Sequence, residues 1–107
     1  MFAPLLGLLY KAGVRVVGRQ RLIDFMRKHQ RARSPVQSWL AEASEADWEK
    51  PLDVKQRFAH MSIVNGHYVF NMGGNKFRLD TRINFDSKTV LVLRIGTHEQ
   101  YGTWSFD

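Results

Sequence analysis

The second half of the chain holds guanidinium, imidazole, phenol and ammonium groups, at Arg78, Arg82, His98, Tyr101 and Lys55. Cleavage of RNA without a metal ion needs groups of these kinds. The 2′-hydroxyl of the RNA attacks the adjacent phosphorus, so the protein supplies a proton acceptor, a proton donor and cations, but no nucleophile. Proton transfer contributes roughly 10²–10⁴-fold, and aimed cations and hydrogen-bond donors add further stabilisation of the transition state. These residue types suit that chemistry if the fold brings them together.

The two arginines belong to the stretch KFRLDTRINF, residues 76–85, in which apolar and polar residues alternate. Successive side chains of a strand point to opposite faces, so the stretch predicts a half-buried strand. Its polar face carries Lys76, Arg78, Asp80, Arg82 and Asn84. The arginines lie about 13 Å apart at roughly 3.3 Å per residue, so only one of them can touch a given phosphate. Asp80 is expected to orient both arginines. The alternative is a solvated sheet face.

The proton-transfer candidates come from loops. His98 follows the apolar run of residues 89–95, in a position of the kind that often carries function, and imidazole exchanges protons near neutral pH. Tyr101 offers a hydroxyl or a ring on which a base can stack. Lys55 offers a phosphate contact or a proton. The alternatives are a surface or capping histidine, a core-edge tyrosine and a solvated lysine.

Two helices are predicted before these loops and strands. Residues 19–29 place apolar side chains on one side and mostly charged side chains on the other, as an amphipathic helix does. The next helix has apolar residues at Val36 and at positions three, four and seven further on. Ser34, Pro35 and Gln37 predict its N-cap, its first turn and a capping box.

The hydrophobic period then changes from 3.6 to 2. Asn65-Gly66 between two apolar runs predicts a hairpin with a type I′ turn. The strand of residues 76–85 follows, and the apolar run of residues 89–95 is typical of a central strand covered on both faces. The order predicts an α+β domain with two N-terminal helices packed on one side of a four-stranded, mainly antiparallel sheet.

Composition limits the remaining possibilities. A chain of 107 residues with 44% hydrophobic content can close one core without staples, and the domain is expected to span residues 14–107. There is no cysteine, and the four histidines show no metal-ligand spacing, so we expect no metal and no cofactor. The absence of cysteine fits a reducing compartment such as the cytoplasm.

Residues 1–13 form an apolar stretch that is too short for a membrane span and a poor signal peptide. We expect a loosely attached, disordered extension, which translation from an upstream start would explain, with Val14 as the alternative initiator. The other interpretation is an apolar segment that packs on a partner or on the domain itself.

The net charge of +6 favours a polyanionic partner, with RNA or DNA first. Seven of the cations fall within residues 14–34, whereas residues 42–53 carry five acids. Such clusters bind phosphates with little sequence preference and with steep salt dependence. The expected RNA contacts are Arg27, Lys28, Arg31 and Arg33 in the helical region, and His67, Lys76 and Arg82 on the strands.

Two blocks of sequence carry a family resemblance. NGHYVFNMGGNKFRLDTRINFD, residues 65–86, and GTHEQY, residues 96–101, together with the upstream DWEKPLDVK, resemble the HigB toxins, a branch of the RelE-like bacterial toxins. The likeness covers roughly residues 14–106. It implies a RelE-like fold, and a toxin that cleaves messenger RNA, typically in the ribosomal A site. It also implies inhibition by a helix-turn-helix antitoxin of the HigA type, which binds DNA itself, so that the toxin meets DNA only indirectly.

The resemblance also bears on individual residues. It places Arg78 at the scissile phosphate and favours His98 and Tyr101 in the catalytic set. One departure concerns Leu93-Arg94, because the family more often has its basic residue at the first of these positions. Arg94 is therefore expected to point to the wrong face for RNA, unless it compensates for the apolar residue at Leu93. The competing function is a noncatalytic module of the same fold that binds RNA or the antitoxin. A DNA-binding regulator lacks support, because neither helix has the pattern of a recognition helix.

Overall fold

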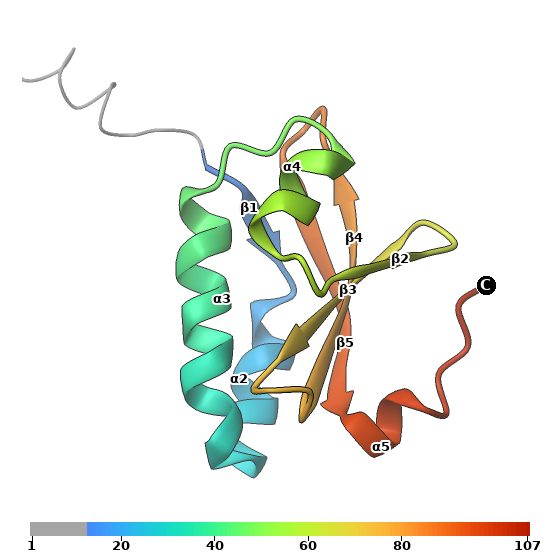
Figure 1. Cartoon of the computed structure of the whole chain (residues 1–107). Helices are drawn as coiled ribbons and strands as arrows, with labels where there is room; N and C mark the ends of the chain where they lie inside the picture. Colours follow the sequence, from blue (N-terminus) through green and yellow to red (C-terminus); the bar gives the residue numbers. More distant parts are fainter. Residues whose placement is uncertain (1–12) are drawn as a thin grey trace, which may run out of the picture.

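The structure, a computed structural model, describes residues 13–107. The predicted apolar extension therefore lies outside the described residues except for Gly13. Five strands form one sheet in the order β1-β5-β4-β3-β2, and helices α2 and α3 pack on one face of it (Figure 1). The predicted α+β class, with N-terminal helices on a mainly antiparallel sheet, is confirmed. The sheet has five strands, one more than predicted.

The fifth strand is short and comes first in the chain. The strands are β1 (Arg15–Val17), β2 (Ser62–Val64), β3 (His67–Met72), β4 (Phe77–Asn84) and β5 (Thr89–Thr97). β1 pairs in parallel with the first half of β5, and the other neighbours are antiparallel. Three residues are too few to show an alternating pattern, which explains why the sequence did not reveal β1.

The hairpin between β2 and β3 is confirmed. Asn65 and Gly66 both have positive φ, at 52° and 82°, as a type I′ turn requires. The prediction that β5 is covered on both faces is wrong. Val90 and Val92 are fully buried, but Leu91 between them is 41% exposed, because none of the helices within residues 13–107 covers the second face at that point.

The helices are α2 (Arg19–Lys28), the 3-10 turn η1 (Gln30–Ala32), α3 (Arg33–Glu45), α4 (Pro51–Arg57) and α5 (His98–Tyr101). α2 buries Leu22 and Phe25, as its pattern predicts. The predicted capping box of α3 is wrong. The chain is already helical at Ala32, which takes the N-cap position without a side-chain cap, so Ser34 lies inside the first turn.

The core lies between the sheet and the helices. Trp39 of α3 packs edge-on against Phe70 of β3, and Trp48 and Phe58 complete this aromatic group. Both tryptophans are buried. Tyr68 lies on the same side of β3, and burial raises the pKa of its hydroxyl. Within residues 13–107, no helix is long and apolar enough to cross a membrane.

Candidate functional site

The site is built on the sheet face that α2 and α3 leave uncovered, which we call the outer face. Strand register arranges it in rows. Asn71, Arg78 and Gly96 form one row across β3, β4 and β5. Val69, Asp80 and Arg94 form the next. Farther along, Arg82 pairs with Leu91, which in turn pairs with Val17 of β1.

One corner of the outer face brings four of the candidate residues together. β5 ends at Thr97, and α5 begins at His98 with a full capping box, in which the Thr97 hydroxyl accepts the Gln100 N–H and the Gln100 side chain accepts the Thr97 N–H. The backbone N–H of His98 donates to the Lys76 carbonyl at 2.9 Å. One turn later, the Tyr101 ring lies 5.0 Å from the Arg78 guanidinium carbon. The backbones of Lys76 and His98 and the side chains of Arg78 and Tyr101 therefore make contact where β4 begins and α5 starts.

Arg78 is held firmly but keeps spare donors. Its Nη1 donates to the carbonyls of Asn75, at 2.8 Å, and Phe77, at 3.3 Å. Both of its hydrogen bonds within residues 13–107 leave from Nη1, and a guanidinium has five N–H donors. Its exposed fraction is only 8%, and the cover comes from α5, not from α2 or α3. His98 is exposed.

A cavity of about 330 Å³ adjoins this corner. It is lined by His60, Asn71, Gly74 and Asn75, and Asn75 is the residue whose carbonyl binds Arg78. Asn71 Oδ1 is buried without a hydrogen-bond partner among the described residues. An unsatisfied buried acceptor costs about 1–3 kcal/mol.

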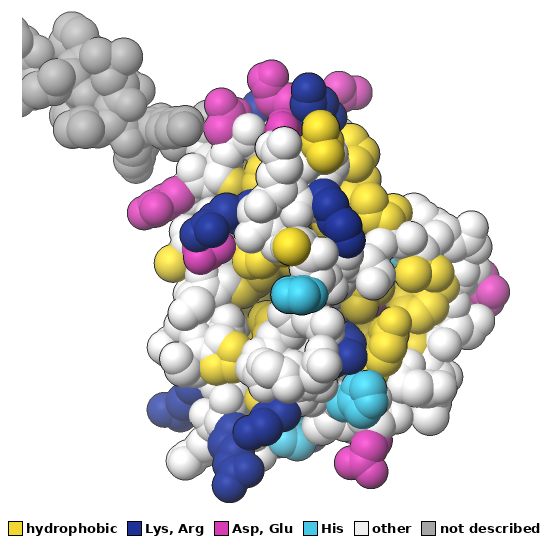
Figure 2. All heavy atoms as spheres, in the orientation of Figure 1, with side chains coloured by type: hydrophobic (Ala, Val, Ile, Leu, Met, Phe, Trp, Pro, Cys, Tyr) yellow, Lys and Arg dark blue, Asp and Glu magenta, His cyan; other side chains and the backbone are white. Residues whose placement is uncertain are grey.

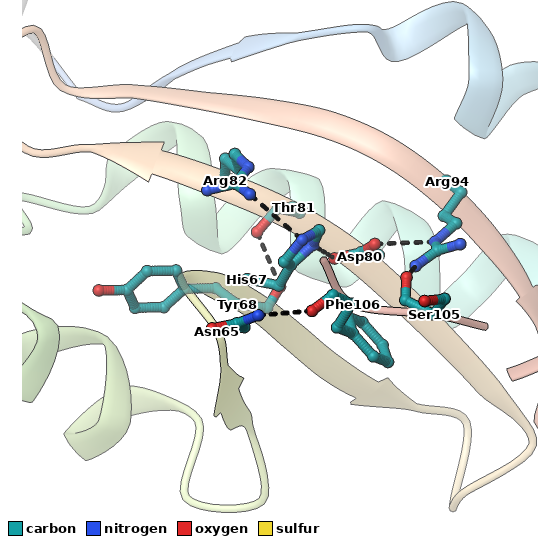
Figure 3. Close-up of polar contacts among 9 residues, drawn as sticks. All are labelled: Asn65, His67, Tyr68, Asp80, Thr81, Arg82, Arg94, Ser105 and Phe106. Carbon is teal, nitrogen blue, oxygen red and sulfur yellow. Dashed lines mark hydrogen bonds and ion pairs between the residues drawn. The ribbon is translucent and has the colours of Figure 1, made fainter. Parts of the chain in front are cut away.

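The second row of the outer face is a buried polar network centred on Asp80 (Figure 3). Asp80 is 0% exposed, and its two carboxylate oxygens accept hydrogen bonds from His67 Nδ1 and Arg94 Nε, each at 2.8 Å. The prediction that Asp80 orients Arg78 and Arg82 is wrong, because its side-chain partners are His67 and Arg94. Arg82 instead lies with Nη2 3.3 Å from His67 Nε2.

Arg94 reaches this network because of a bulge. Asp80 pairs with Arg94 and Thr81 pairs with Val92, so Leu93 is the extra residue on β5. In a regular ladder without this bulge, Leu93 would stand opposite Asp80. The bulge re-aims the side chains that follow, as bulges do, and Arg94 lies on the outer face. The expectation that Arg94 points away from this face is therefore wrong.

The C-terminal segment, residues 102–107, crosses over the network on the side of the sheet opposite α2 and α3 (Figure 1). Arg94 Nη2 donates to the Ser105 carbonyl at 2.7 Å, and its guanidinium lies over the rings of Trp104 and Phe106. The Phe106 ring meets His67 edge-on at 5.1 Å. No catalytic or RNA-binding role was predicted for this segment from sequence. The available signal was the alternation of Trp104, Ser105 and Phe106, which puts both rings on one side of an extended chain.

The remaining candidates lie apart from the corner. Lys55, on α4, donates its ammonium hydrogen to the Met61 carbonyl. His67 is buried under Phe106, so a contact with RNA would require that ring to move. Arg82 is exposed beyond the network. The helical cations are all exposed, and they are Arg27, Lys28, Arg31 and Arg33.

Figure 2 shows basic side chains gathered at the end of the molecule where α2 turns into α3. A cavity of about 240 Å³ lies between α2 and β5 and is lined by residues that include Lys28 and Arg94. The basic helical surface therefore borders the edge of the sheet that leads to the corner. No group of three or more acidic, histidine or cysteine side chains within residues 13–107 is arranged to hold a metal ion.

Comparison with known proteins points to one family. The profile of the HigB toxin, described as the RelE-like toxic component of a toxin-antitoxin system, matches residues 32–104. The mRNA interferase toxin HigB of Escherichia coli (strain K12) is 32% identical over 57 residues, which are 50% of this chain and 55% of that protein. The mRNA interferases HigB of Escherichia coli O157:H7 and Shigella flexneri match at the same identity and coverage. The chain thus spans about half the length of the curated relatives it matches.

Proposed function

The chain belongs to the HigB family of RelE-like toxic components of toxin–antitoxin systems, and from this membership we propose that it is an endoribonuclease that cleaves messenger RNA on the ribosome. The relatives bear the name mRNA interferase. The single observation that carries the proposal is the corner in which Lys76, Arg78, His98 and Tyr101 meet.

The proposed reaction uses the RNA's own nucleophile. The 2′-oxygen attacks the adjacent phosphorus and gives up its proton to a base on the protein. The bond from phosphorus to the 5′-oxygen breaks, and that oxygen receives a proton. The products are a 2′,3′-cyclic phosphate and a 5′-hydroxyl, so atoms and charge balance without a metal or a covalent enzyme intermediate.

Arg78 is assigned to the scissile phosphate. Its donors outside Nη1 remain for phosphate oxygens, and donors already fixed in place stabilise developing charge without reorganisation. The Tyr101 ring beside it limits water around the guanidinium. Lys76, exposed at the start of β4, adds a second positive charge at the same corner.

His98 and Tyr101 are assigned to proton transfer. Both project from the single turn of α5, whose capping box fixes its start. Imidazole can accept the 2′-hydroxyl proton at neutral pH, and the phenol can donate to the leaving oxygen or stack on a base. Lys55 is assigned as a phosphate contact or proton donor.

The cavity beside Arg78 offers room for a nucleotide next to the cleaved bond. The unpartnered Oδ1 of Asn71 would accept an N–H from a base edge. His60 stands on the rim of the same cavity.

We assign contacts with RNA outside the corner to exposed positive charges. Arg82 lies on the open part of the outer face, and the α2 and α3 cations border the sheet edge. These positions would neutralise phosphates of messenger or ribosomal RNA without reading sequence. The same basic surface would receive acidic side chains of a cognate helix-turn-helix antitoxin. Charge reversal of Arg27, Lys28, Arg31 and Arg33 should weaken both associations, and unchanged affinity for ribosomes and antitoxin would contradict this assignment.

One observation favours a second function, a noncatalytic module that binds RNA or the antitoxin. Arg78 is 8% exposed in the free protein, and a phosphate must reach it past Tyr101. If the Tyr101 ring stays over the Arg78 guanidinium, the corner would bind RNA without cleaving it.

The deciding experiment incubates the purified protein with translating ribosomes and a defined messenger RNA, and maps 5′-hydroxyl ends. Wild-type protein should cut the message. Arg78→Ala and His98→Ala should each lower the rate by on the order of 100-fold, with an unchanged circular dichroism spectrum. Arg57→Ala is the control, because the exposed Arg57 side chain pairs with Glu42 of α3 and has no role in the proposed reaction. Absence of cuts with wild-type protein, while it still binds ribosomes, would favour the noncatalytic module.

A further inference from the structure

We propose that Asp80 and Arg94 are positioning residues for the RNA site. They hold the C-terminal segment across the outer face, so that its aromatic rings support Tyr101 and Tyr101 supports the Arg78 guanidinium. The catalytic part of this inference rests on the proposed function. The contact path itself is a property of the free protein and can be measured without RNA.

The path begins at the Asp80 carboxylate, which lies wholly out of solvent. Burial of a charge is costly unless partners compensate it, and here both oxygens are used. A carboxylate only accepts, so His67 carries its hydrogen on Nδ1, and the Nε2 atom accepts from Arg82. The other oxygen fixes Arg94 through Nε, which leaves the Nη groups of Arg94 free to reach outward.

The next step runs from Arg94 to the C-terminal segment. Nη2 holds the Ser105 carbonyl at 2.7 Å, and the guanidinium lies 4.5 Å from the Trp104 ring and 5.1 Å from the Phe106 ring. Cation–π contacts of this kind contribute about 0.5–1 kcal/mol each at exposed sites. A guanidinium can make the ion pair, the hydrogen bond and the ring contacts together because it is flat and has donors at three nitrogens.

Two more contacts hold the end of the C-terminal segment in place. Asn65, in the hairpin turn, donates through Nδ2 to the Phe106 carbonyl at 2.7 Å. The His67 ring meets Phe106 edge-on. Asp80 therefore acts on Phe106 twice, through Arg94 and through His67.

The last step runs from the segment to Arg78. Trp104 and Phe106 meet the Tyr101 ring at 5.6 and 6.1 Å, and Tyr101 in turn meets Arg78 at 5.0 Å. α5 has only four residues, and so short a helix is marginal by itself. Its placement depends on what packs beside it. A Cβ at Gly96 would lie 2.9 Å from Trp104, so only glycine lets the segment rest this closely on β5.

The test uses Arg94→Gln and Asp80→Asn, with Asp86→Asn and Arg57→Gln as exposed controls of matched charge change. Two readouts need no activity. Trp39 and Trp48 are buried in the core, so acrylamide quenching reports mainly on Trp104. The Nε–H resonance of Arg78 is shifted by the ring current of Tyr101. Both variants should increase quenching and move this resonance toward its value in Tyr101→Ala, whereas the controls should leave both signals in place.

The third readout is RNA cleavage. A misplaced guanidinium should lower kcat on the order of 10- to 100-fold, with KM changed less than about twofold, because the RNA-binding cations are intact. Arg94→Lys keeps the positive charge but loses the flat guanidinium that lies over the aromatic rings, so it should restore little of the kcat lost in Arg94→Gln. A purely stabilising role would instead lower the melting temperature and leave kcat of the folded fraction unchanged.

Each outcome decides the question. Unchanged quenching and resonance in Arg94→Gln would overturn the contact path. A moved resonance with unchanged kcat would overturn the positioning role. If wild-type protein cuts no RNA, the proposed function fails, and the Arg78 resonance alone then confirms or overturns the path. If Asp80→Asn does not fold, Arg94→Gln carries the test, because the Arg94 side chain is 34% exposed and a glutamine amide can still donate a hydrogen bond to the Asp80 carboxylate.

Discussion

The outer face of the sheet has two parts that carry similar residue types under different cover. Near α5, Arg78, Asp80 and Arg94 lie beneath aromatic side chains of α5 and the C-terminal segment. Beyond them, Arg82 is exposed and Leu91 and Val17 are about two-fifths exposed. A shallow cavity of about 500 Å³ on this open part is lined by residues that include Arg15, Arg82 and Leu91.

The comparison shows that one alternating strand can serve two purposes. Under cover, a charge must be paired, so Asp80, Arg94 and His67 form a network with fixed partners. In the open part, Arg82 is exposed and touches the network through a contact of its Nη2 with His67. Substitutions should therefore be costly on the covered part and mild on the open part, which gives four predictions.

The largest effect is expected at Asp80. Asp80→Ala removes the partner of the buried His67 and of the part-buried Arg94, and it should lower the free energy of unfolding by about 3–5 kcal/mol. Urea denaturation followed by circular dichroism would measure it. Asp86→Ala, in the exposed turn between β4 and β5, should change that free energy by less than about 0.5 kcal/mol. Equal losses at the two aspartates would abolish the distinction between the two parts.

A smaller loss is expected at the C-terminal segment. Phe106→Ala removes ring contacts with His67, Trp104 and Arg94 and should cost about 1–2 kcal/mol of unfolding free energy. Thermal denaturation would measure it, and Asp107→Ala is the control. A variant as stable as wild type would mean that the segment does not hold the covered part together.

Arg82→Ala should change RNA binding with only a small change in stability, because the Arg82 side chain is exposed and its contact with His67 is a long one of 3.3 Å. The loss of one exposed phosphate contact should weaken binding to single-stranded RNA similarly for different sequences, and reduce the slope of log affinity against log salt by about 1. Titrations at several salt concentrations would measure this slope. An unaltered slope would mean that the open part does not touch phosphates.

The mildest expected change is at Leu91. Leu91→Thr replaces a side chain that is 41% exposed on the open part, and threonine suits a strand. The free energy of unfolding should change by less than about 0.5 kcal/mol. A loss of unfolding free energy above about 1 kcal/mol would show that in solution the open part is covered by a group outside residues 13–107.

Capping boxes illustrate how far the sequence could be read. The pattern of Ser or Thr followed three residues later by Gln occurs at Ser34 and at Thr97. The first was predicted as a cap and is not one, since η1 makes the chain helical before it. The second was not predicted and forms completely. The motif is local, but whether a helix starts there depends on the conformation of the preceding residues.

The candidate site could likewise be predicted from the sequence only in part. The family blocks directed attention to Arg78, His98 and Tyr101, and the structure brings these three residues to one corner. The partners of Asp80 could not be predicted, because the bulge at Leu93 decides which residue of β5 stands opposite it. In the sequence, the polar face of β4 gives no sign that its two parts differ. The C-terminal segment creates the difference, because it covers one part of this face and leaves the other exposed.

The sequence by itself determined the α+β class, the hairpin at Asn65-Gly66 and the two faces of β4, because these depend on periods and turn preferences within a few residues. The tertiary structure decided which charges are buried and what they hold. Asp80 meets Arg94 across 14 positions and Asn65 meets Phe106 across 41. Contacts over such separations depend on strand register and on the path of the whole chain, and no local pattern encodes them.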